Sequence, residues 1–186
     1  MIVNFGPTRI EETLAGDEVS SRTVQFGNQA EQVQFLRKMV DEYRTVAAIR
    51  ARARDIVFRQ YMSIPKDPLA HALAIGEWVQ QNITYVNETP EVFQTPTHTV
   101  ATGYGDCDDF TTLICALCES IGIETELVAL EWGGAFRHIF PRALIKRGGI
   151  VYRVPLDATL PYPVRLQTDP VQIALRRRYN LRVYIA

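Results

Sequence analysis

The spacing of hydrophobic residues changes once along this chain, near residue 125, and this change restricts the possible folds more than any other feature. Before it, apolar residues recur at three- and four-residue steps, which is the pattern of amphipathic helices. After it, β-branched and aromatic residues predict strands over residues 125–132, 137–145, 150–156 and 181–185. Helices followed by strands, without regular alternation, favour an α+β fold over a doubly wound sheet.

Three helices are predicted before the strands. The first covers residues 29–61 with a break near Thr45, and the second covers residues 68–82 with Asp67 as its N-cap. The third covers residues 107–121 and is followed by a glycine that favours its end.

The remaining N-terminal residues, 1–27, show little periodicity and predict an extended arm. We therefore divide the chain into this arm, a helical extension over residues 28–65, and a core with its C-terminal segment over residues 66–186.

The composition is that of an ordinary globular protein, with 47% hydrophobic and 22% charged residues. A net charge of −1 argues against a general polyanion binder, so we expect no nucleic-acid partner. No apolar run approaches the roughly 18 residues of a membrane span, and the first residues lack the features of a secretion signal. Cys107, Cys115 and Cys118 lie within one predicted helix, which argues against disulfides and favours a reducing compartment such as the cytoplasm.

The most informative short motif is Gly105-Asp106-Cys107-Asp108-Asp109, because it places a cysteine where a loop becomes a helix. A helix N-terminus can lower the pKa of a thiol from about 8.5 toward about 3.5–7.5. The three aspartates suit the positive end of the helix dipole and can cap free amides. We prefer this capping to a metal site, because three adjacent aspartates on one turn are not expected to face one ion. Cys115 and Cys118, farther along the helix, are expected in the core.

A histidine follows on the second predicted strand, at His138, and an aspartate follows directly after the third, at Asp157. If residues 146–149 form a four-residue hairpin loop, these two lie opposite each other, and the aspartate can accept the imidazole Nδ1–H. A two-residue turn at Gly148-Gly149 would instead shift the register by two and make the pair diagonal.

These motifs together resemble the core of the transglutaminase-like superfamily. The resemblance rests on Gly105-x-Cys107-x-Asp109-Phe110, a helix ending in Ile121-Gly122-Ile123, a later strand histidine, and Asp157-Ala158-Thr159. It extends upstream to the pattern between Ala74 and Tyr85, and covers roughly residues 66–160. It implies a papain-like fold in which the helix bearing the nucleophile packs on an antiparallel sheet. The Gly105-Asp106-Cys107-Asp108-Asp109 motif, with Gln94-x-Pro96 before it, looks most like the transglutaminase-like proteins of bacteria and their phages.

The resemblance implies a cysteine-dependent acyl-transfer enzyme, in the first place a peptidase or amidase acting on a peptide or protein. Cys107 would be the nucleophile, His138 its base and Asp157 the residue that orients the histidine. No cofactor and no metal are expected.

Several alternatives stay open at this point. Gln94 is the candidate side-chain donor to the oxyanion and Tyr104 an alternative, while His98 is the alternative base. An amine in place of water would make the same site a transglutaminase. In a different class, the chain would be a non-catalytic or vestigially active structural or interaction module of a phage particle or its assembly, located in the virion. In either class, the arm over residues 1–27 is a candidate contact for protein partners.

Overall fold

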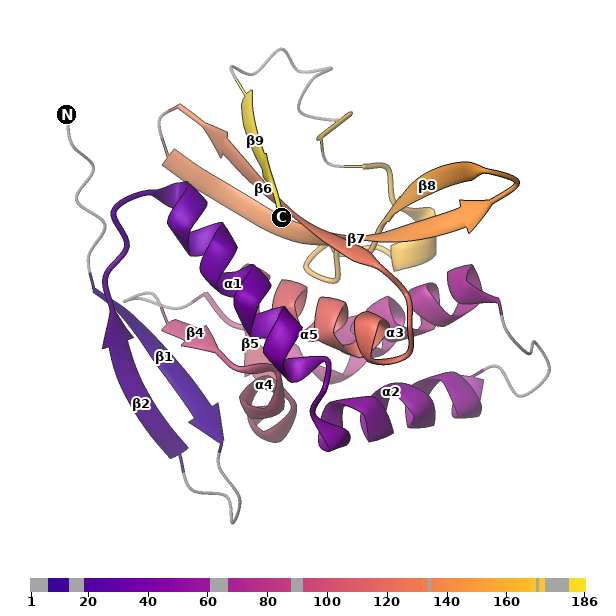
Figure 1. Cartoon of the computed structure of the whole chain (residues 1–186), viewed down its shortest axis with the longest axis horizontal. Coiled ribbons are helices and arrows are strands. Elements are labelled where there is room, and N and C mark those ends of the chain that lie inside the picture. Colours follow the sequence, from indigo (N-terminus) through magenta and orange to yellow (C-terminus); the bar gives the residue numbers. More distant parts are fainter. Residues whose placement is uncertain are drawn as a thin grey trace.

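The computed structural model describes residues 7–13, 19–60, 67–87, 92–133, 135–169, 171–172 and 181–186. Helix α5 (Cys107–Ser120) lies at the centre of the molecule (Figure 1). It packs against a four-stranded sheet and against the other helices, and Leu113, Ile114 and Leu117 are fully buried in these contacts. The predicted α+β fold, with the cysteine helix packed on an antiparallel sheet, is confirmed.

Four further helices within the described residues contact α5, and their bounds are α1 (Gln29–Tyr43), α2 (Ala47–Gln60), α3 (Pro68–Asn82) and α4 (Pro96–Thr102). The predicted break near Thr45 is confirmed, because it falls between α1 and α2. The side chain of Asp67 accepts a hydrogen bond from the Leu69 amide at 3.0 Å, so the predicted N-cap of α3 is also confirmed. None of the described helices is long and apolar enough to cross a bilayer.

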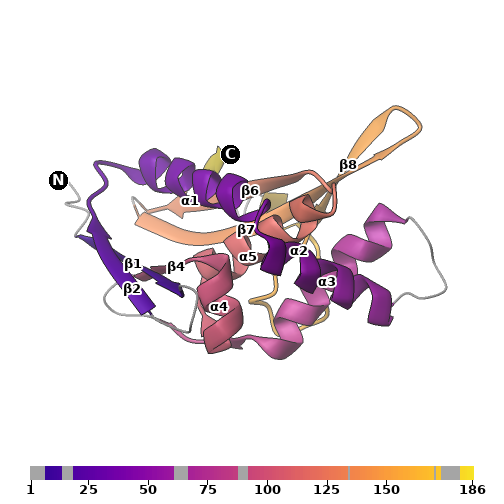
Figure 2. The same cartoon turned by 60° about the horizontal axis from the view of Figure 1, so that its bottom comes forward.

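The main sheet has the strand order β8-β7-β6-β9, and all neighbours are antiparallel. Its strands are β6 (Thr125–Trp132), β7 (Ala135–Arg147), β8 (Ile150–Pro155) and β9 (Leu181–Ile185). The sheet buries one face against α5, and the β7–β8 hairpin projects beyond the rest of the molecule (Figure 2).

The β7–β8 hairpin has the second of the two registers that the sequence allowed. Arg147 pairs with Ile150, so the turn consists of Gly148 and Gly149 alone, with φ of 57° and 79°. Two successive residues with positive φ are the requirement of a type I′ turn, whose twist matches that of the strands. The four-residue loop is therefore wrong, and His138 and Asp157 are displaced from direct opposition.

A β-bulge lies immediately before His138. Leu130 of β6 pairs with His138 and Glu131 pairs with Phe136, so Arg137 is the extra residue on β7. Bulges bend a strand locally and change the direction of the next side chains, and they are frequent beside active sites. The pairing of β7 with β6 is therefore regular after His138 and irregular directly before it.

Two small sheets flank the start of α5. One has the order β2-β1-β4, from β1 (Thr8–Thr13), β2 (Val19–Val24) and β4 (Val92–Gln94); the other pairs β3 (Thr84–Tyr85) with β5 (Tyr104–Gly105) in parallel. The described part of the expected arm is thus paired with a strand of the core region, with Glu11 beside Gln94. The division at residues 27 and 65 stays a prediction.

Candidate active site

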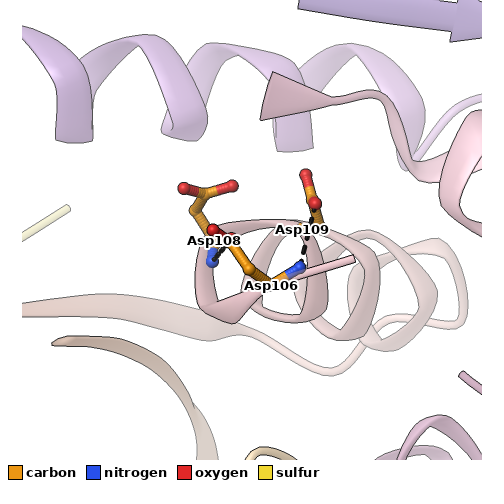
Figure 3. A group of neighbouring side chains, drawn as sticks. All are labelled: Asp106, Asp108 and Asp109. Atoms are coloured by element: carbon orange, nitrogen blue, oxygen red, sulfur yellow. Dashed lines mark hydrogen bonds between the residues drawn. The ribbon is translucent and has the colours of Figure 1, made fainter. Parts of the chain in front are cut away.

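The first turn of α5, which begins with the half-buried Cys107, is held by a capping box (Figure 3). Asp106 is the N-cap, and its Oδ1 accepts a hydrogen bond from the Asp108 amide at 3.2 Å. Asp109 reaches back, and its Oδ2 accepts from the Asp106 amide at 3.1 Å. These two carboxylates cap the helix as predicted, and their charge is directed at backbone amides.

Asp109 also ties β4 to the helix. Its Oδ1 accepts from the Gln94 amide at 2.7 Å, so the two oxygens of one buried carboxylate bind two backbone N–H groups. Gly105 is required for this approach, because a Cβ atom there would lie 2.7 Å from Asp109 Oδ2. The position of Cys107 is therefore set by buried polar contacts on both sides of the loop.

The three aspartates lie closer together than the sequence suggested. One carboxylate oxygen from each of Asp106, Asp108 and Asp109 lies within 4.8 Å of the others. Contrary to the expectation from the sequence, the three carboxylates converge, because the N-cap residue lies outside the helix and turns back over its first turn. Capping accounts for the contacts of Asp106 and Asp109 given above.

His138 and Asp157 are joined by a short hydrogen bond, with 2.6 Å between Nε2 and Oδ2. Because an ionised carboxylate can only accept hydrogen bonds, Nε2 carries the hydrogen. The expectation that Nδ1 faces the aspartate was wrong, since the diagonal register presents the far nitrogen of the ring. Nδ1 is then the imidazole nitrogen available as a base. The His138 ring stacks on Phe140, with 5.9 Å between the ring centroids.

Asp157 is itself held on every side, with only 1% of its surface exposed. Its Oδ1 accepts from the amide and the hydroxyl of Thr159, at 3.1 and 2.6 Å. Gln167, which follows the short helix η1 (Val164–Leu166), binds the main chain of Asp157 twice. It accepts from the Asp157 amide at 2.9 Å and donates to the Asp157 carbonyl oxygen. Sequence reasoning missed Gln167, because a side chain that binds a backbone leaves no pattern in the sequence.

Tyr85 lies beside the loop that leads into α5, because it pairs with Gly105 of β5. The pKa of its phenol is raised to about 12, first by burial and then by negative charge at Cys107 and at aspartates that include Asp157. The Tyr85 ring also meets Phe110 of α5 edge to face, at 5.9 Å between centroids. The sequence indicates Tyr85 only as the end of the upstream family pattern.

The other candidates have structural surroundings of their own. The side chain of Gln94 is buried and its Oε1 accepts from the Thr102 hydroxyl at 3.3 Å. His98 is buried, with Nδ1 2.7 Å from the Thr13 hydroxyl, so it is not an exposed base. Cys115 and Cys118 are fully buried, and burial raises the pKa of both thiols, to about 12 for Cys115.

Comparison with known proteins identifies a family for part of the chain. Residues 50–140 match the family profile of the transglutaminase-like superfamily, and this segment contains α3, α5 and the first part of β7 up to residue 140, with His138. Residues 50–140 form a transglutaminase-like core. The suspected family is confirmed, and it is a family of cysteine-based enzymes.

Two solved structures resemble this chain at low identity. A candidate protease from Parabacteroides distasonis has 13% identity and a TM-score of 0.51, over 81% of this chain and 39% of that chain. A candidate cysteine protease from Cytophaga hutchinsonii has 18% identity and a TM-score of 0.48, over 79% of this chain and 53% of that chain. This chain thus spans about half or less of either protein, and the first similarity supports the fold alone. No curated protein matches the sequence significantly.

Proposed function

We propose that the protein is a cysteine-dependent peptidase or amidase that uses Cys107, His138 and Asp157. The observation that carries the proposal is the 2.6 Å bond between His138 Nε2 and the buried Asp157 carboxylate. An aspartate held in this way keeps the hydrogen on Nε2 and leaves Nδ1 as a base. It also stabilises the imidazolium that forms when Nδ1 takes up a proton.

The first half of the reaction would form a thioester. His138 Nδ1 takes the proton from the Cys107 thiol, and the thiolate attacks the carbonyl carbon of the substrate amide. The Cys107 amide, and by family resemblance the Gln94 side chain, would stabilise the oxyanion. The C–N bond then breaks while the imidazolium gives its proton to the leaving amine.

The second half would release the acid. Water gives a proton to His138 Nδ1 and attacks the thioester carbonyl, and the C–S bond breaks. The thiolate then takes the proton back, so the site returns to its first state. An amine attacking in place of water would complete a transamidation by the same steps, and this is the one alternative reaction that the same groups support.

The acyl-enzyme is the species to look for. The protein would be incubated with a set of peptide p-nitroanilides, and the intact mass would be followed for an adduct that hydroxylamine removes. We expect the adduct on the wild type and none on Cys107→Ser, with Cys115→Ser as the control because its thiol is buried. Addition of methylamine would separate the two reactions, since a transglutaminase yields the methylamide. An adduct that persists in Cys107→Ser would contradict the proposal.

A further inference from the structure

A hollow of about 410 Å³ is lined in part by Phe110, near the start of α5, and by Ala158, the residue after Asp157. This volume falls within the range of about 300–1,000 Å³ found for small-molecule and side-chain pockets. The described residues that line it come from α3, β3, α5 and the loop after Asp157, and they are Gln80, Ile83, Tyr85, Phe110, Ala158, Leu160, Pro161, Tyr162 and Pro163.

The hollow adjoins the reacting groups on two sides. Phe110 lies three residues after Cys107, on the same face of α5, and Ala158 directly follows Asp157. Tyr85, which lines the hollow, pairs with Gly105, two residues before Cys107. A substrate with its carbonyl at Cys107 would therefore have part of its chain over this hollow.

The walls have the chemistry of an apolar site. None of the described lining residues carries a charge. The amide of Gln80 is used inside the wall, since its Nε2 donates to the carbonyl oxygens of Leu160 and Tyr162 at 2.8 and 3.0 Å. Two aromatic rings stay partly open to solvent, with Tyr85 47% and Tyr162 38% exposed. Covering such a surface with an apolar group lowers the free energy of the complex, because apolar area is removed from water. A charged group buried there would lose its hydration, which raises the free energy of the complex.

We propose that this hollow binds an apolar or aromatic side chain of the substrate, close to the amide that Cys107 attacks. The assignment rests on the proposed function and adds the substrate class. Two prolines and the Gln80 contacts hold the loop over residues 160–163 in place, so the hollow exists before the substrate binds. It selects against substrates with a charged side chain at this position.

Three peptidyl chloromethyl ketones that differ only in the side chain next to the electrophile, Phe, Glu or Lys, would test this. In each case the Cys107 thiolate displaces chloride and a C–S bond forms, and peptide mass spectrometry gives the rate. Each rate is divided by the rate with iodoacetamide, which needs no pocket. We expect the Phe reagent to react about tenfold or more faster than the charged ones.

A charged residue in the wall should then change the preference. We expect Tyr162→Arg to favour the Glu reagent, while Tyr152→Arg, a similarly exposed tyrosine on β8 outside the hollow, keeps the wild-type order. Equal rates for the three reagents would overturn the pocket, even where iodoacetamide labelling still depends on His138. Loss of that dependence on His138 would instead contradict the proposed triad.

Discussion

Asp109→Asn tests how the start of α5 is held, because the change replaces one carboxylate oxygen with an NH₂ group and leaves the shape unaltered. The Asp109 carboxylate is fully buried and accepts from the amides of Gln94 and Asp106, at 2.7 and 3.1 Å. An amide has one acceptor oxygen, so one of these N–H groups would face an NH₂ group. A buried donor left unsatisfied costs about 1–3 kcal/mol, and the surviving bond loses its charge assistance, about 1 kcal/mol more.

The expected loss in the free energy of unfolding is therefore about 3 kcal/mol. For a chain of this length, about 2–4 °C of melting temperature corresponds to 1 kcal/mol, so thermal unfolding followed by circular dichroism should show a fall of about 6–12 °C. Asp106→Asn is the matched control, since asparagine is as good an N-cap as aspartate and its oxygen can still accept from Asp108. A melting temperature for Asp109→Asn within about 2 °C of the wild type, or an equal loss in both variants, would refute the reasoning.

Three further changes have defined outcomes. Thr159 donates to Asp157 Oδ1, so in Asp157→Asn the NH₂ group would face His138 Nε2 and move the imidazole hydrogen to Nδ1. We expect acyl-enzyme formation to slow by about 10³–10⁴-fold while the fold is retained, and a decrease of less than tenfold would contradict this expectation. The Gln167→Glu side chain cannot donate to the Asp157 carbonyl, and we expect the rate of acyl-enzyme formation to fall by about ten- to a hundredfold. We expect that Gln167→Met, which can make neither hydrogen bond to the Asp157 main chain, does not restore this rate. Burial lowers the pKa of His98, so the unfolded chain takes up a proton before the folded chain does as the pH falls through about 6.5, and the free energy of unfolding decreases. Urea unfolding at pH 7 and pH 5 should show a smaller decrease for His98→Gln than for the wild type. A decrease equal to that of the wild type would exclude His98 as the cause.

The bounds of helices and strands were predicted correctly where the local sequence contains a capping residue or a run of β-branched residues. Asp67-Pro68 starts α3, and the β-branched runs define β6 and β9 with the expected bounds. The hairpin register was not predictable in the same way. Lys146 and Arg147 fit a loop or a strand equally well by composition, and only the pairing of Arg147 with Ile150 decides between the two turns.

The candidate site shows the same division between local and distant signals. Cys107 could be placed at a helix start because the aspartates around it are capping residues. His138 and Asp157 could be proposed as partners because one lies on a predicted strand and the other directly follows the neighbouring strand of the same hairpin. Which imidazole nitrogen faces the aspartate depends on the register of the hairpin. The expectation that Nδ1 faces Asp157 was therefore wrong, because it assumed the four-residue loop. Gln167 could not be found, because its contacts with the Asp157 main chain are set by the path of the chain after β8 and not by a sequence pattern.

The most direct test of the proposed triad is the rate at which iodoacetamide alkylates Cys107 as a function of pH, in the wild type and in His138→Ala. Cys115 and Cys118 are buried and should stay unlabelled in the folded protein, so peptide mass spectrometry reports on Cys107 alone. We predict that the wild type reacts at about pH 6 nearly as fast as at about pH 8, and that His138→Ala follows the ionisation of an ordinary thiol, near pH 8.5. A wild-type profile that already follows an ordinary thiol, and that the substitution of His138 leaves unchanged, would contradict the account.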